Sequence, residues 1–159
     1  MSANLDQDIL QFWSLLFHIL TDIEERIAAH IATQALSPPQ FYVLKTLFEH
    51  GGECAIGKIA SEHHLTNATM TGLVKRLEQH DPPLVMRSRN AHDRRSIMVT
   101  LTEAGRERYN AVSLQIMAQV RDMMALLDDD GRDKMIEYAS YYISNVVPRF
   151  PVDEINRHP

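Results

Sequence analysis

The segment from Leu84 to Thr102 constrains the fold more than any other part of this sequence, because it interrupts a pattern that is otherwise helical. It consists of a short apolar run, the charged loop SRNAHDRR, and a second run in which apolar and polar residues alternate. Such alternation is typical of a strand with one buried face. The segment therefore predicts a β-hairpin. Because a strand pair cannot bury charge, we expect its arginines at the exposed tip.

Helical periodicity precedes this hairpin. Apolar residues recur every three or four positions from Leu5 to about Thr33, which predicts one long helix. A second helix is expected from Ser37, as N-cap, to the Gly51-Gly52 pair. The segment CAIGKIASEHHL predicts a short strand edge followed by a short helix with Ile59, Ala60 and Leu65 facing inward. A fourth helix begins at Thr66, and its buried stripe comprises Met70, Leu73, Val74 and Leu77.

Two further helices are expected after the hairpin. Thr102 is a suitable N-cap, and the helix that it starts runs to about Leu127. The segment DDDGR is expected to interrupt the helical pattern, and a last helix spans about Arg132 to Val146. The remaining tail contains three prolines without periodicity and is expected to be coil. Together these elements predict a mainly α fold with a small β-hairpin wing.

Charge is unevenly distributed along the 159 residues, whose net charge is −5. The segment from Ile56 to Arg95 holds seven basic and four acidic residues, a net +3; the remaining nine basic and 17 acidic residues give −8. A basic middle between acidic flanks indicates a local contact with a polyanion.

The single cysteine, Cys54, is typical of a reducing compartment, and we expect it to be a buried small hydrophobe. No signal peptide or transmembrane run is evident, so we expect a cytoplasmic protein.

Two short helices followed by a hairpin form a winged helix-turn-helix, and the helix from Thr66 has the surface that DNA recognition requires. Its face opposite the apolar stripe is small and polar, so it can approach base edges in the major groove. Arginines at the hairpin tip suit the negative potential of a narrow minor groove. We expect major-groove contacts from Asn67, Ala68, Thr71, Gly72 and Lys75, phosphate contacts from Thr69, Arg76, Arg87 and Arg94, and minor-groove contacts from Arg89, Asn90 and Arg95, with Asp93 orienting Arg95.

The hairpin sequence resembles the wing signature of the MarR-type winged-helix transcription factors. The matching positions are Leu84, Val85, Arg87, Asp93, Arg95, Val99, Leu101, Thr102 and Gly105. The segments LSPPQFYVLKTL and LTNATMTGLVKRLE are similar to the second helix and the recognition helix of that family. The resemblance implies a homodimeric regulator that binds a pseudo-palindromic operator in double-stranded DNA. It further implies repression by occupying promoters, with release by a small aromatic or anionic effector or by an oxidant.

The resemblance also implies a division of the chain. Residues 1–35 and 103–147 would form a helical dimerisation region, 36–102 the winged helix-turn-helix lobe, and 148–159 a C-terminal tail. Two positions depart from the family pattern. The sequence HDPPLV stands where relatives usually have a glycine before the wing, and Gly72 stands where many carry a larger polar or basic residue. The first departure implies a stiffer hinge before the wing, and the second implies fewer direct base contacts.

Other functions receive less support from the sequence. Candidate effector-binding residues are Trp13, Phe17, His18, Tyr42 and Tyr109, with ordinary dimer core as the alternative reading. The eight histidines lack metal-ligand spacing, so we expect no metal and no cofactor. Motifs for nucleophilic or phosphate chemistry are missing, so we expect no enzyme. The alternative to DNA binding is a winged-helix module that binds another protein.

Overall fold

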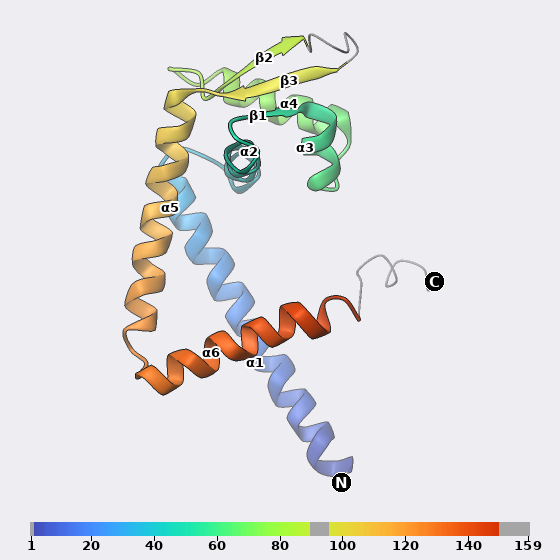
Figure 1. Cartoon of the computed structure of the whole chain (residues 1–159), viewed down its shortest axis with the longest axis vertical. Coiled ribbons are helices and arrows are strands. Elements are labelled where there is room, and N and C mark those ends of the chain that lie inside the picture. Colours follow the sequence, from blue (N-terminus) through green and yellow to red (C-terminus); the bar gives the residue numbers. More distant parts are fainter. Residues whose placement is uncertain (1, 90–95, 150–159) are drawn as a thin grey trace. The chain divides into compact units, whose positions relative to one another are not determined.

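The computed structural model describes residues 2–89 and 96–149, and within them the chain is mostly helical (Figure 1). It divides into two compact units, one ending at Ile116 and one beginning at Met117. The elements are α1 (Ser2–Ala32), α2 (Pro38–Glu49), β1 (Glu53–Ala55), α3 (Ile56–Glu62), α4 (Asn67–Glu78), β2 (Val85–Arg89), β3 (Ile97–Leu101), α5 (Glu103–Met124), α6 (Asp129–Tyr141) and the π-helical turn η1 (Tyr142–Val146).

The predicted wing is confirmed, and it belongs to a larger sheet. Strands β2 and β3 pair antiparallel, with Arg87 opposite Val99. The short strand expected at Cys54 is β1, and it pairs antiparallel with the other edge of β3, Cys54 opposite Val99. The order β1-β3-β2 therefore makes β3 the central strand and leaves β2 as an edge of the sheet. The wing is thus anchored to the lobe by β1 as well as by its own connections.

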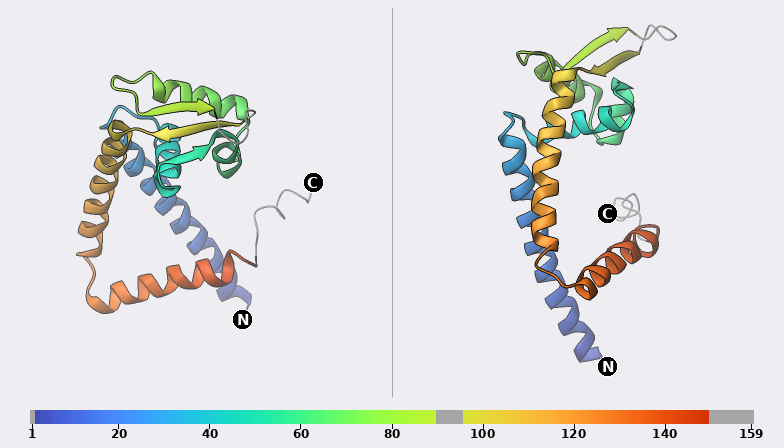
Figure 2. Two further views of the ribbon diagram at one scale, coloured as in Figure 1. Left: turned by 45° about the horizontal axis from the view of Figure 1, so that its top comes forward. Right: turned by 60° about the vertical axis from the view of Figure 1, so that its left-hand side comes forward.

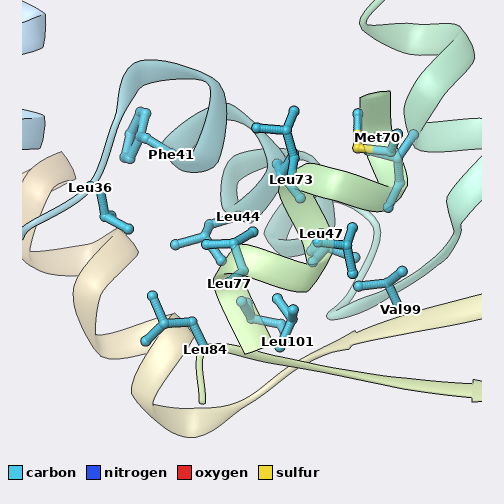
Figure 3. Close-up of a cluster of buried hydrophobic side chains, with 14 of the residues drawn as sticks. Leu36, Phe41, Leu44, Leu47, Met70, Leu73, Leu77, Leu84, Val99 and Leu101 are labelled. Carbon is cyan, nitrogen blue, oxygen red and sulfur yellow. The ribbon is translucent and has the colours of Figure 1, made fainter. Parts of the chain in front are cut away.

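One hydrophobic core joins the helices of the lobe to the sheet (Figure 3). The stripe predicted for the fourth helix is buried, and it packs with the apolar face of α2. The sheet contributes Val85, Val99 and Leu101, and Leu84 enters the same core just before β2. Because α4 supplies one whole face to this core, its opposite face is directed to the exterior.

The predicted starts of the helices at Thr66, Thr102 and Ser37 are confirmed, and each has a local cause. The hydroxyl of Thr66 accepts a hydrogen bond from the backbone N–H of Thr69 at 3.1 Å, which caps α4. The hydroxyl of Thr102 accepts from the N–H of Gly105 at 3.1 Å and donates to the carbonyl of Pro83 at 2.7 Å. Ser37 precedes α2 with Pro38 in its first turn, as expected.

One residue of the expected core lies elsewhere. Leu65 was predicted to face inward with Ile59 and Ala60, but it is 38% exposed, whereas the other two are buried. The cause is the end of α3, where His64 adopts a left-handed conformation at φ +53°. The N–H of Leu65 then bonds to the carbonyl of Ala60 at 2.9 Å, a helix ending that turns the chain away from the core.

The helices after the wing differ from the prediction at one junction. Helix α5 ends at Met124 rather than near Leu127, since tight turns close there: Leu127 N–H bonds to the Met124 carbonyl at 3.2 Å. The helical pattern is interrupted at residues 125–128, so only Asp128 of the segment DDDGR lies in the break. The rest of the segment starts α6, because Asp128 accepts from the N–H of Gly131 at 2.8 Å. Acidic residues then occupy the first turn, where the helix dipole favours them.

Helix α1 is a single long helix (Figure 2). Most of its large apolar residues are exposed. Ile31 is buried near the end of the helix, and Ile27 packs against the lobe core. Towards the N-terminus the large apolar side chains are exposed, Phe12 by 64%. A helix with such a surface is unusual in a protein that stands alone. Within the described part of the chain, no helix is long and apolar enough to cross a membrane.

A partly buried contact joins α5 to the residues that follow α4, and it predicts a pH effect on stability. An Arg108 guanidinium nitrogen donates to the carbonyl of Gln34 at 2.9 Å and lies 3.3 Å from Nδ1 of His80. Burial, together with the Arg108 charge, lowers the pKa of His80 below the ordinary 6.5. The unfolded chain then binds protons more readily, so the free energy of unfolding falls as the pH drops below about 6.5.

We expect His80→Asn to reduce this loss of stability. Asparagine offers Arg108 an amide oxygen but does not titrate, so the variant should lose less stability than the wild type between roughly pH 7.5 and pH 5. Urea unfolding at a series of pH values measures the difference. Equal pH slopes for the two proteins would contradict the assignment to His80.

Candidate nucleic-acid interface

The exposed face of α4 carries the residues that the sequence predicted for it. Asn67, Ala68, Thr69, Lys75 and Arg76 are exposed, while Thr71 and Gly72 are half-buried. They lie opposite the buried stripe, so the protein core holds this face outward in one orientation. An α-helix of this kind fits the major groove of B-DNA. Lys75 and Arg76 lie in the last turn, where their charge also suits the helix dipole.

Hydroxyl groups on α4 already have partners within the helix. The hydroxyls of Thr66 and Thr69 lie 2.9 Å apart, so this pair belongs to the N-terminal cap. The hydroxyl of Thr71 donates to the carbonyl of Asn67 at 2.7 Å. Its oxygen can therefore still accept a hydrogen bond, and its methyl group remains available for apolar contact.

Gly72 has no packing reason to be glycine. A Cβ built on this residue meets no heavy atom within 4 Å, and the helix around it is regular. Glycine within a helix costs about 1 kcal/mol relative to alanine. The lobe therefore carries a stability cost at the centre of this face, where the missing side chain lets another molecule approach the backbone.

The structure describes only part of the arginine-rich tip. Arg87 is the third residue of β2, and Arg89 ends that strand as an exposed side chain opposite Ile97. The side chains of Glu78, Arg87, Ser88, Arg89 and Ile97 line an open hollow of about 320 Å³ at the base of the wing. Four of the residues predicted to bind DNA lie outside the described residues: Asn90, Asp93, Arg94 and Arg95.

Sequence reasoning missed one side chain at this surface. The carboxylate of Glu78 accepts a hydrogen bond from the backbone N–H of Arg87 at 3.0 Å and one from its Nε at 2.8 Å. A guanidinium NH2 group lies 2.7 Å from the same carboxylate. Arg87, which was predicted to hold a phosphate, thus forms an ion pair within the lobe. The pair could have been suspected from the sequence, because the acidic Glu78 ends a predicted helix and the basic Arg87 follows nine residues later in a predicted strand.

The five candidate effector residues are not gathered in one cavity. Phe17 and His18 line a shallow hollow formed by α1 alone, and Trp13 contacts Phe17 with their ring centroids 5.6 Å apart. Tyr42 lines a different cavity of about 300 Å³ with Glu24, Ile27, Ala28 and Pro38. Tyr109 packs between the rings of Phe41 and Phe48, at centroid distances of 5.6 and 4.5 Å, on the edge of the core.

Sites for other chemistry receive little support. Cys54 is buried in β1 as predicted, and burial raises the pKa of its thiol, which keeps it protonated and unreactive. Across residues 2–89 and 96–149, no group of three or more histidine, cysteine or acidic side chains is placed to hold a metal ion.

Comparison with known proteins identifies similar chains. A sequence model described as "MarR family" matches residues 36–97, from the end of the α1–α2 turn to the start of β3. An uncharacterized HTH-type transcriptional regulator of Bacillus subtilis, YsmB, is 29% identical over 113 residues, which cover 71% of this chain and 75% of that protein.

Solved structures share the fold. The YusO protein of B. subtilis superimposes with a TM-score of 0.75 at 23% identity, covering 88% of this chain and 97% of its own. A point mutant of MepR from S. aureus, bound to an oligodeoxyribonucleotide, superimposes with a TM-score of 0.63 at 20% identity, covering 84% and 97% of the two chains. Both likenesses extend well beyond the wing and the helices that precede it.

Proposed function

We propose that this chain, which belongs to the MarR family, is a transcriptional regulator that binds double-stranded DNA as a homodimer. The observation that carries the proposal is the outward face of α4, small and polar with Gly72 open at its centre, beside a wing that bears basic residues. That combination suits simultaneous insertion of a helix into the major groove and a hairpin into the minor groove. The basic segment from Ile56 to Arg95 provides the electrostatic attraction.

Within this proposal the side chains have three roles. The α4 face from Asn67 to Lys75 reads base edges, and the arginines near its end and at the start of the wing hold phosphates. Arg89 and the tip residues enter the minor groove, where Asp93 orients Arg95. The full proposed set is Asn67, Ala68, Thr69, Thr71, Gly72, Lys75, Arg76, Arg87, Arg89, Asn90, Asp93, Arg94 and Arg95.

The exposed apolar surface of α1 supports the homodimer. We propose that residues 1–35 and 103–147 bring two copies together, leaving residues 36–102 of each as a DNA-binding lobe. Two lobes related by a two-fold axis match a pseudo-palindromic operator whose half-sites lie about one helical turn apart. Such a dimer would repress by occupying a promoter, and a small aromatic or anionic effector would release it. The cavity of about 300 Å³ beside Tyr42 is one candidate place for this effector.

Selection from a random duplex library tests the proposal. Purified protein at about 0.15 M salt should enrich an inverted repeat with half-sites about one turn apart, and affinity for the enriched sequence should fall steeply with salt because bound phosphates release counterions. Failure of the folded dimer to enrich any duplex would favour the alternative, a winged-helix module that binds protein.

Gly72→Ala should raise the stability of the protein and lower its affinity for DNA. We expect the free energy of unfolding to rise by up to about 1 kcal/mol, since alanine is the better helix former and its Cβ has open space. We expect operator affinity to fall about tenfold, since the methyl group would stand between α4 and the base edges.

Two measurements check this prediction: thermal unfolding, and titration of the selected duplex at fixed salt. Ser61→Ala is a matched control, because Ser61 is exposed on α3 outside the proposed face. Unchanged or tighter DNA binding by a stabilised Gly72→Ala protein would remove this position from the interface.

A further inference from the structure

Glu78 lies at the joint between the helix and the wing that are proposed to enter the two grooves of DNA. It is the last residue of α4, and Arg87 is the third residue of β2. One carboxylate oxygen accepts the backbone N–H of Arg87 at 3.0 Å, and the other accepts its Nε at 2.8 Å. Both side chains are partly buried, with exposed fractions of 23% for Glu78 and 34% for Arg87.

This contact is the second of two between α4 and the path of β2. The first is a backbone hydrogen bond at the base of the wing, from the N–H of Leu84 to the carbonyl of Leu77, at 3.0 Å. Strand β2 is also held by its pairing with β3 and by the burial of Val85, so it moves together with the sheet. The attachment at Arg87, three residues beyond Leu84, adds a direct link between this edge of the sheet and the end of α4.

The position of β2 in the sheet gives the contact its strength. Since β2 is an edge strand, its outward N–H groups have no strand to pair with. Glu78 satisfies the N–H of Arg87 and at the same time binds the guanidinium. Charge-assisted bonds of this kind are stronger than neutral ones, and partial burial limits their screening by salt.

Electrostatics alone predicts that the Glu78 carboxylate weakens DNA binding. A negative charge beside a bound polyanion repels it, and the ion pair also offsets the charge that Arg87 would present to a phosphate. Removal of Glu78 should therefore strengthen DNA binding if nothing else were involved. A positioning role predicts weaker binding to the operator, because the wing would no longer be held where the minor groove lies.

We propose that Glu78 is a positioning residue for DNA recognition, which sets the direction of the wing relative to α4 through Arg87 without touching DNA. This inference rests on the proposed function. Holding the wing in a fixed direction before binding matters most for a duplex that α4 and the wing must contact at the same time. Non-specific binding, which depends mainly on total charge, should not need it.

The test compares Glu78→Gln with the wild type on the selected operator and on a scrambled duplex, each over a range of salt concentrations. Glutamine retains one acceptor oxygen but loses the charge. We expect about tenfold weaker operator binding, unchanged or tighter binding to the scrambled duplex, and an unchanged salt slope. Glu53→Gln is the matched control, since Glu53 lies on β1 at the opposite edge of the same sheet.

Variants of Arg87 distinguish positioning from direct phosphate contact. If the pair acts as a unit, the double variant Glu78→Gln/Arg87→Gln should lose no more operator affinity than Arg87→Gln alone. A salt slope that falls by about one in Arg87→Gln alone, with Glu78→Gln binding normally, would overturn the inference and assign Arg87 to a phosphate.

The outcomes also separate this inference from the proposed function. A wild-type protein that selects no duplex would overturn both. A wild type that selects an operator while folded Glu78→Gln binds it as tightly as Glu53→Gln does would overturn the positioning role alone. Circular dichroism and thermal unfolding establish that each variant is folded.

Discussion

Gly105→Ala is expected to lower the free energy of unfolding by about 3 kcal/mol. A Cβ built on Gly105 lies 2.1 Å from the carbonyl oxygen of Leu84 and 2.8 Å from Cδ1 of Leu101. The nearest atom is backbone, so no side-chain rotation relieves the clash. The first turn of α5 and the entry to β2 must move apart.

That movement breaks a junction on which the lobe depends. The same carbonyl of Leu84 accepts the N–H of Thr102 at 3.1 Å, and the Thr102 hydroxyl donates to the carbonyl of Pro83. Leu84 and Leu101 are both in the hydrophobic core. Displacing α5 therefore disturbs the helix cap and the core together, and the costs add to the steric strain.

The sign of the effect makes this prediction easy to test. Glycine to alanine within a helix normally stabilises, as expected for Gly72→Ala, in which the Cβ meets open space. Urea unfolding of the two variants should give shifts of opposite direction. A Gly105→Ala protein as stable as the wild type would mean that α5 and β2 are not packed as closely as these distances indicate.

The elements that the sequence predicted well are those with local causes. Helix α4 follows from a threonine cap and an apolar stripe of helical period, and both can be read within one segment. The wing follows from alternation around a charged loop. In the same way the outward face of α4 was predictable, because burying Met70 and Leu77 leaves the opposite side for Ala68 and Lys75.

The features that the sequence did not predict depend on distant residues or on turn geometry. The inward orientation expected for Leu65 failed because the left-handed turn at His64 carries no strong sequence signal. The pairing of Glu78 with Arg87 spans a turn whose path no periodicity specifies. Likewise, the aspartates before Gly131 have the same composition whether they separate two helices or start one.

The other large effect is expected at the apolar surface of α1. Ile9→Asp/Phe12→Asp places two charges among side chains that recur at helical spacing and are exposed in the single chain, among them Leu5, Ile19 and Ile23. Burying each such side chain against a second copy contributes about 1.5–3 kcal/mol, and a carboxylate cannot be buried there without a partner. We expect the dissociation constant of the homodimer to rise by a factor of at least about a thousand.

The monomer should remain folded, because neither side chain belongs to the core of the lobe. Operator affinity should nevertheless fall by about a hundredfold or more, since one lobe engages only one half-site. Sedimentation and DNA titration measure the two effects on the same sample.

A charge-matched variant decides whether the apolar face or the added charge is responsible. Gln7→Asp/Gln11→Asp introduces the same two charges on the opposite side of α1, given about 100° of rotation per residue, where both glutamines are exposed. This control should remain dimeric and bind the operator with nearly wild-type affinity. If both double variants lose affinity equally, charge near the DNA is the cause; if Ile9→Asp/Phe12→Asp stays dimeric, the copies meet through a surface other than the apolar face of α1.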